Sequence, residues 1–225
     1  MFFPHRYDRN LILTPEMQLA LGKKKTAVIG LGGLGGFVTE ELARFGVGHI
    51  LGFDFDLFSE TNLNRQLLCT EQALGRPKTE TAAERVGQIN SDIRFETVSG
   101  RLGESELTEA LRGCDAVLDC LDSVKDRLVL ERICERLDLP MVHGAIGGWY
   151  GQVSTIYPGD RTLERLYAGS EEPEGTDGNT VFTAALIASL QVSETVKLLT
   201  GQGNTLKDRI LTVDLLSNDF AEIIL

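Results

Sequence analysis

A glycine-rich stretch early in the chain carries the first sign of chemistry. After the apolar run TAVI comes a turn with closely spaced glycines: Gly30, Gly32, Gly33 and Gly35. Glycines between a strand and a helix let backbone N–H groups approach phosphate oxygens, and the helix N-terminus adds partial positive charge. Asp54 and Asp56 come about 20 residues later, where nucleotide-binding folds place the acid that binds ribose hydroxyls. The pattern predicts a nucleotide site, although a tight turn without ligand, or a nicotinamide dinucleotide site, would share these features.

The residues after this acidic pair favour a triphosphate. Asn62, Arg65 and Gln66 follow in SETNLNRQ, and Lys78 follows in GRPK, just before a helical pattern. The β- and γ-phosphates of a triphosphate need cationic partners, whereas the bridging phosphates of a dinucleotide are satisfied by backbone donors. Asn62 and Gln66 would add neutral donors around the same oxygens. The alternative is a solvated polar loop with an ordinary surface lysine.

A further acid follows the apolar run DAVL. Asp122 and Ser123 stand in DCLDS, directly beyond that run. Ligands of open α/β sheets bind at the carboxyl ends of the strands, and a carboxylate that faces a triphosphate there would hold Mg²⁺ bridged to phosphate oxygens. Alternatively, Asp122 and Ser123 cap the helix that follows. Asp119 is interpreted as structural.

The elements that must position these residues alternate along the chain. Short apolar runs alternate with helical patterns, which predicts βαβ units and a mainly parallel, Rossmann-like α/β sheet flanked by helices. Expected strands cover 26–30, 49–56, 94–100, 115–120 and 140–145, and expected helices cover 34–46, 76–90, 105–113 and 124–138. Beyond residue 147 we expect a strand at 151–159, a long helix at 179–201 and an added antiparallel pair at 208–216 and 219–225.

We interpret residues 1–225 as a single domain in three parts. Residues 1–24 form a helical arm, 25–147 the nucleotide-binding part, and 148–225 a crossover loop, the long helix and the antiparallel strands. The polar stretch 159–178 is expected to be a mobile loop. Without internal repeats, nothing in the sequence calls for a second domain.

Composition narrows the classes of function. The net charge of -11 and the lack of a long basic run argue against a nucleic-acid partner. The four cysteines, at 69, 114, 120 and 134, form no CxxC pair, so we expect neither a disulfide framework nor zinc, in keeping with a reducing cytoplasm. No signal-like leader is evident, and we expect no apolar run to reach the roughly 20 residues of a membrane span.

The motifs VIGLGGLGG, DFDLFSETNLNRQ, GRPK and CLDS, in this order, resemble the ThiF/MoeB/HesA family, bacterial relatives of ubiquitin-activating enzymes. The resemblance runs from RYDRN near the start to the end of the chain. It implies a homodimeric enzyme that uses ATP and Mg²⁺ to adenylate the C-terminal glycine of a ubiquitin-like sulfur carrier (ThiS-like or MoaD-like) for thiamine, molybdopterin or tungstopterin synthesis.

The resemblance also implies roles for single residues. Gly33 would lie against the nucleotide, Asp54 would bind its ribose, and Asn62, Arg65 and Lys78 would contact the triphosphate. Asp122 would organise Mg²⁺. Arg9, in the RYDRN arm, would reach into the active site of the partner subunit. Arg9, Arg65, Lys78 and Asp122 are therefore the expected catalytic residues.

Some features depart from the family pattern. Cysteines that hold zinc in many relatives, and a cysteine in the crossover loop of some, have no counterpart here, so a separate protein would deliver the sulfur. Ser123 stands where the family usually has asparagine, and this serine is a point of similarity to the tRNA threonylcarbamoyladenosine dehydratases. Adenylation of a small-molecule or tRNA-borne carboxylate is therefore the alternative function, and a nucleotide-sensing module without catalysis is a third. His143, Cys69 and Cys120 are interpreted as structural.

Overall fold

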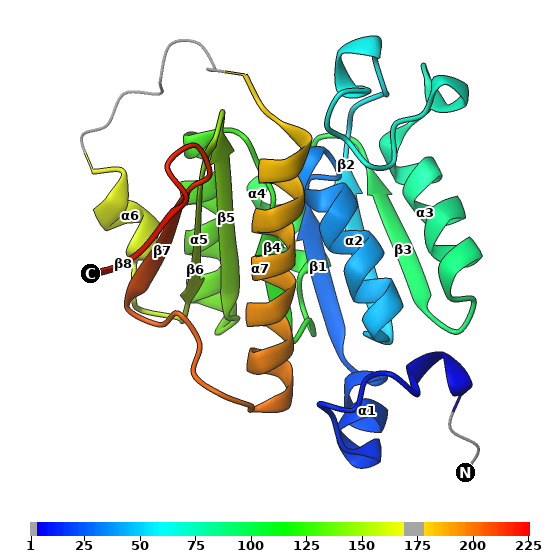
Figure 1. Cartoon of the computed structure of the whole chain (residues 1–225), viewed down its shortest axis with the longest axis horizontal. Helices are drawn as coiled ribbons and strands as arrows, with labels where there is room; N and C mark the ends of the chain where they lie inside the picture. Colours follow the sequence, from blue (N-terminus) through cyan, green and yellow to red (C-terminus); the bar gives the residue numbers. More distant parts are fainter. Residues whose placement is uncertain (1–3, 169–177) are drawn as a thin grey trace.

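The computed structural model describes residues 4–168 and 178–225. Its centre is one eight-stranded sheet in the order β3-β2-β1-β4-β5-β6-β7-β8 (Figure 1). The chain runs outward from β1 to β3, then returns to the other side of β1 for β4. The direction of winding therefore reverses between β1 and β4, which is the crevice where ligands of such sheets bind.

Five neighbouring strands are parallel, as predicted. They are β1 (Lys25–Ile29), β2 (His49–Asp54), β3 (Arg94–Ser99), β4 (Ala116–Asp119) and β5 (Met141–Gly147). β1 and β4 are almost entirely buried because helices cover both faces of the sheet. That burial explains why these strands appear in the sequence as continuous apolar runs instead of alternating patterns.

Helices form a layer on each face. One apolar core lies beneath α2 (Gly33–Phe45), α3 (Lys78–Ile89) and α7 (Val181–Thr200). The other lies beneath α4 (Glu104–Ala110), α5 (Val124–Leu137) and the short α6 (Thr162–Leu166) (Figure 1). The sheet with its two helical layers is the α/β architecture that the alternating pattern predicted.

The C-terminal part adds antiparallel strands. β6 (Tyr150–Ile156) pairs antiparallel with β5, and β7 (Arg209–Asp214) and β8 (Asp219–Ile224) continue the sheet to a fully exposed edge. One correction concerns α7: among the described helices it has the length and mean hydropathy (1.3) to cross a membrane, contrary to the expectation that no apolar run reaches that length. Half of it is buried against the sheet and α2, as in the core helix of a globular fold.

The polar stretch after β6 differs from the expected loop. Residues 162–166 form α6, whereas residues 169–177 of the predicted mobile loop lie outside the described residues. A buried carboxylate explains the helix: Glu131 of α5 accepts hydrogen bonds from the backbone N–H groups of Leu163 (2.7 Å) and Glu164 (2.9 Å). A tertiary contact therefore caps α6, and no local pattern announces it.

The N-terminal arm comprises η1 (His5–Tyr7) and α1 (Pro15–Leu21). It packs at the C-terminal end of α2, where Asn10 and Gln18 donate to the carbonyl of Phe45 at 3.3 and 2.9 Å. In Figure 1 the arm lies at the lower end of the sheet, away from the start of α2. This placement keeps the arm remote from the glycine-rich turn of its own chain.

Candidate functional site

The glycine-rich turn joins β1 to α2 with little room for side chains. Gly30 has a φ of 93°, in the left-handed region, and a Cβ on it would lie 2.8 Å from the carbonyl oxygen of Cys120. A Cβ on Gly35 would lie 1.7 Å from the carbonyl oxygen of Gly30. Gly32 is the N-cap of α2, so the N–H groups of the helix's first turn have no capping side chain. The turn is a cradle of backbone donors, suited to phosphate.

Asp54, at the end of β2, is tied to this turn. Its carboxylate accepts hydrogen bonds from the backbone N–H groups of Leu31 and Asp56, both at 2.8 Å. The Lys78 ammonium lies 3.9 Å from Asp54 and 3.0 Å from the carboxylate of Asp56. The structure therefore brings together the acidic pair, the lysine and the glycine turn that the sequence singled out. Asp54 additionally helps to fix the turn's shape.

The segment between β2 and α3 carries the predicted polar residues and is held by hydrogen bonds within itself. Asn62 accepts the N–H of Ser59 at 3.1 Å, so its amide oxygen has a structural task. Gln66 is 6% exposed; its amide nitrogen would lie 3.6 Å from a Cβ on Gly32, and its buried Oε1 has no hydrogen-bond partner in the described part of the chain. A buried acceptor without a donor beside a phosphate-binding turn fits a bound ligand that carries hydroxyl or amino groups.

Arg65 extends from the same segment. It donates to the carbonyl of Thr61 at 2.8 Å and to the amide oxygen of Asn64 at 3.0 Å. No carboxylate of residues 4–168 or 178–225 forms an ion pair with it. Its charge is therefore available to an anion.

Asp122 lies across the crevice, beyond β4. It is exposed, and the hydrogen bonds and ion pairs found among the described residues leave its carboxylate without a partner. Ser123 is the N-cap of α5 and accepts the N–H of Asp126 at 3.3 Å, so the capping role falls to Ser123 rather than to Asp122. This placement leaves Asp122 free for a cation.

A magnesium ion at Asp122 would need other ligands. In the part of the chain that the structure describes, no group of three or more His, Cys, Asp or Glu side chains could hold a metal ion. Magnesium bound through one carboxylate usually takes its other oxygens from phosphates and water. The lone exposed carboxylate opposite a phosphate cradle fits that arrangement.

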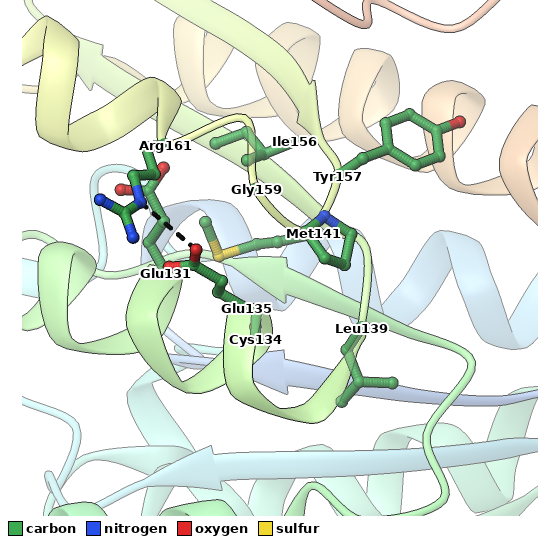
Figure 2. A pocket seen from close by; sticks show the side chains of 10 residues that line it. Glu131, Cys134, Glu135, Leu139, Met141, Ile156, Tyr157, Gly159 and Arg161 are labelled. Carbon is green, nitrogen blue, oxygen red and sulfur yellow. Dashed lines mark hydrogen bonds and ion pairs between the residues drawn. The ribbon is translucent and has the colours of Figure 1, made fainter.

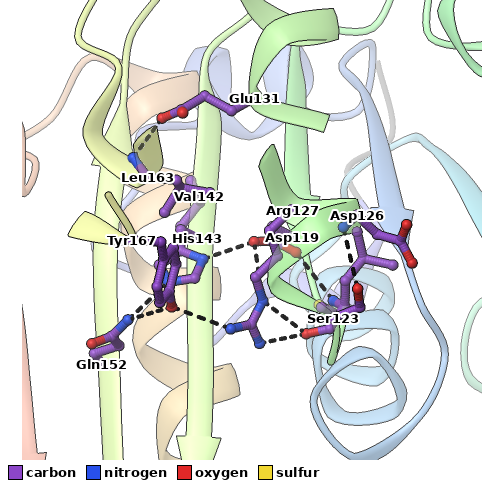
Figure 3. A network of polar contacts seen from close by, with 12 residues as sticks. Asp119, Ser123, Asp126, Arg127, Glu131, Val142, His143, Gln152, Leu163 and Tyr167 are labelled. Carbon is purple, nitrogen blue, oxygen red and sulfur yellow. Dashed lines mark hydrogen bonds and ion pairs between the residues drawn. The ribbon is translucent and has the colours of Figure 1, made fainter. Parts of the chain in front are cut away.

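A buried polar network connects the end of β4 with β5, β6 and the first turns of α5 (Figure 3). His143 Nδ1 lies 2.7 Å from Asp119, and Gln152 donates to His143 Nε2 at 3.1 Å, so the imidazole proton is on Nδ1. Burial lowers the pKa of His143 below its ordinary value, which keeps the ring neutral. Asp119 and His143 are both fully buried, which agrees with the structural interpretation of each.

Arg127 and Tyr167 were not predicted as site residues from the sequence. Arg127, 7% exposed, donates to the carbonyl of Leu121 at 3.1 and 2.5 Å and to the Tyr167 hydroxyl at 3.3 Å. A signal existed for it: Arg127 and Glu131 lie on the same face of α5 as the buried Leu130 and Cys134, with helical spacing. Charges on the apolar face of a helix point to buried polar contacts.

Two further features are a pocket that lies apart from the crevice and the surroundings of the cysteine thiols. A small pocket between α5 and β6 is lined by side chains that include Glu131, Cys134, Met141 and Arg161 (Figure 2). Burial raises the pKa of the Cys134 thiol, and Cys69 is buried as predicted. Burial also raises the pKa of the Cys120 thiol, which lies next to the glycine turn, well above its ordinary value. None of these thiols has the stabilised thiolate of a nucleophile.

Comparison with known proteins now decides the family. The sequence profile described as the ThiF family matches residues 7–225. The chain belongs to the ThiF family. The family predicted from the glycine turn, the Asn-Arg-Gln segment, the lysine and the Asp-Ser pair is thereby confirmed.

Individual relatives of this ThiF-family chain agree. It is 34% identical to the molybdopterin-synthase adenylyltransferase of Haemophilus influenzae, over 97% of this chain and 93% of the relative. It is 32% identical to the sulfur carrier protein ThiS adenylyltransferase of Escherichia coli, over 87% of this chain and 81% of the relative. The fold matches the crystal structure of E. coli MccB with ATP at a TM-score of 0.86 and 19% identity, covering 99% of this chain and 72% of that one.

Proposed function

We propose that this chain is an ATP-dependent adenylyltransferase that activates the C-terminal glycine of a ubiquitin-like sulfur carrier protein as an acyl-adenylate. The observation that carries the proposal is the arrangement at the switch point between β1 and β4. A backbone phosphate cradle lies there with Arg65 and Lys78 on one side and the unpartnered Asp122 on the other. The names of relatives that align over most of the chain support adenylyl transfer to carriers of this kind.

The reaction needs no nucleophilic side chain. An oxygen of the carrier's C-terminal carboxylate forms a bond to the α-phosphorus, and the bond from that phosphorus to the pyrophosphate oxygen breaks. Arg65 and Lys78 would balance charge on the departing pyrophosphate, and the N–H groups at the start of α2 would hold the α-phosphate. Mg²⁺, when bound at Asp122, would neutralise phosphate charge. Catalysis of this kind is positioning and charge neutralisation.

We also propose that the active enzyme is a cytoplasmic homodimer that draws Arg9 from the neighbouring subunit. Arg9 is exposed, and the arm that carries it packs at the wrong end of α2 to serve its own site. The arm exposes Leu11 (83%) and Ile12 (70%), apolar surface that a partner subunit would cover. Sulfur transfer would follow on a separate protein, because no cysteine of this chain has a nucleophile's surroundings.

The test is ATP–pyrophosphate exchange with Mg²⁺ and purified ThiS-like or MoaD-like carriers ending in Gly-Gly. We expect exchange that requires one carrier and falls about a hundredfold or more in Asp122→Ala. Asp126→Ala is the matched control, since it removes an exposed carboxylate on the first turn of the adjoining α5. Tight ATP binding without exchange for any carrier would contradict the protein substrate. Equal losses in both variants would contradict the specific role of Asp122.

A further inference from the structure

We propose that Arg127 is a positioning residue for metal-dependent nucleotide binding: by holding the carbonyl of Leu121, it fixes the backbone from which Asp122 extends. The inference rests on the proposed role of Asp122 and concerns what makes that carboxylate usable. Arg127 itself is buried, and its guanidinium lies between the carbonyl of Leu121 and the hydroxyl of Tyr167 (Figure 3).

The backbone between β4 and Asp122 is fixed at nearly every polar group. The N–H of Cys120 bonds to the carbonyl of Ile29 (3.0 Å), and the N–H of Leu121 bonds to the Asp119 carboxylate (3.1 Å). Gln191, fully buried on α7, donates to the carbonyl of Asp119 (2.9 Å). The carbonyl of Leu121 is the last of these groups before Asp122, and Arg127 binds it through both Nε and Nη2.

Arg127 is held in turn by contacts with two elements, and a third element holds one of its partners. Its guanidinium lies 3.9 Å from Asp119 on β4 and donates to the Tyr167 hydroxyl at the end of α6. The same hydroxyl accepts from Gln152 of β6 at 3.0 Å. Because His143 is neutral, Arg127 is the charge that balances Asp119. Because the guanidinium is held in place and donates two hydrogen bonds, it restricts the Leu121 carbonyl to one position.

The consequence concerns Asp122. It is the first residue beyond the fixed segment, and within the described residues nothing holds its side chain. Its carboxylate position is therefore set by its backbone, and that backbone is set by Arg127. Displacing a charge-neutralising group by about 1 Å can cost about a hundredfold in rate, so the clamp on Leu121 bears directly on the reaction.

The test compares Arg127→Lys with Arg132→Lys, which makes the same change at an exposed position on the same helix. Lysine keeps the positive charge but lacks the two guanidinium donors that bind the Leu121 carbonyl. Binding of α,β-methylene ATP is measured by calorimetry with Mg²⁺ and with EDTA, and the half-saturating Mg²⁺ concentration is measured in pyrophosphate exchange. We expect Arg127→Lys to weaken Mg²⁺-dependent binding about tenfold and to raise the Mg²⁺ requirement, with EDTA binding changed by less than about twofold. Arg132→Lys should match the wild type.

A double-mutant cycle separates positioning from a general loss of structure. In the Asp122→Ala background, Arg127→Lys should cause no further loss of Mg²⁺-dependent binding, because residues that act through one another are not additive. Equal weakening with Mg²⁺ and with EDTA, or full additivity with Asp122→Ala, would overturn the inference. If Arg127→Lys does not fold, Tyr167→Phe decides, since it removes one anchor of the guanidinium and should raise the Mg²⁺ requirement in the same direction.

The outcomes also separate this inference from the proposed function. Wild-type Mg²⁺ dependence in Asp122→Ala would refute the metal role of Asp122 and this inference together. A defective Asp122→Ala with an unaltered Arg127→Lys and Tyr167→Phe would refute the positioning role alone.

Discussion

Arg9 gives the most demanding prediction, because its own subunit cannot use it. The arm contacts the carbonyl of Phe45 at the last turn of α2, and the glycine turn is at the first. With 13 residues in α2, the two ends are separated by about 20 Å. An extended arginine side chain spans only a small part of that distance. If Arg9 acts in catalysis, it must act on the site of another subunit.

Mixing two inactive variants tests this. Arg9→Ala and Asp122→Ala should each lose about a hundredfold in pyrophosphate exchange, as expected for removal of one charge-stabilising group. In a mixed dimer, the Arg9→Ala subunit still carries Asp122 and receives Arg9 from its neighbour, so one of the two sites is complete. Random exchange of equal amounts gives half mixed dimers, each with one good site, and about one quarter of wild-type activity should return.

The control is a mixture of Arg65→Ala with Asp122→Ala. Both residues belong to the same site of one chain, so no mixed dimer contains a complete site and no activity should return. Absence of recovery in the Arg9→Ala mixture, although subunit exchange is verified with tagged chains, would refute the action of Arg9 on a partner. A monomer by light scattering under assay conditions would refute it as well.

Three further predictions address the crevice and the buried polar network. Gly35→Ala should lower the free energy of unfolding by about 3 kcal/mol, because its Cβ would lie 1.7 Å from the carbonyl oxygen of Gly30. Chemical denaturation measures this against the control Gly87→Ala, which has open space around the new Cβ, and equal stability of the two variants would contradict the close packing. Burial lowers the pKa of His143 below 6.5, so as the pH falls through that value the unfolded state binds a proton first and the wild-type protein loses stability. Unfolding curves at pH 7 and pH 5 should not show this part of the loss for His143→Asn, and identical pH profiles for the two proteins would contradict a lowered pKa. Cys120→Ala should retain pyrophosphate exchange within about threefold, because the enclosed thiol has a raised pKa and cannot serve as a nucleophile at neutral pH; loss of exchange in a folded variant would reverse that assignment.

The sheet could be predicted because its strands carry local signals. β1 and β4 are apolar runs between polar stretches, and the glycines after β1 mark a strand-to-helix turn whatever else the chain does. The topology of the sheet then predicts where the strands end, because parallel strands linked by right-handed crossovers bring the ends of β1, β2 and β4 to one edge. Asp54 and Asp122 could therefore be assigned to one crevice from the sequence alone.

Tertiary contacts explain what the sequence did not reveal. α6 has five residues and follows an N-cap, Arg161, in the left-handed region; it exists because Glu131, about 30 residues earlier, caps it. Arg127 and Tyr167 are 40 residues apart, and neither belongs to a motif. The charge of Arg127 on the apolar face of α5 indicates a buried polar contact, but it does not indicate which backbone carbonyl the side chain holds.

The two walls of the crevice are therefore built differently. Arg65, Lys78 and Asp54 are organised by contacts within one continuous segment and the adjoining turn, so substitutions there should act mainly on the group replaced. The Asp122 wall is fixed by side chains from α5, α7 and, through Tyr167, α6. Changes far from the crevice, at the base of α6 or on α7, should thus alter Mg²⁺ dependence before they alter affinity for metal-free nucleotide. That asymmetry follows from long-range support on one wall and short-range support on the other.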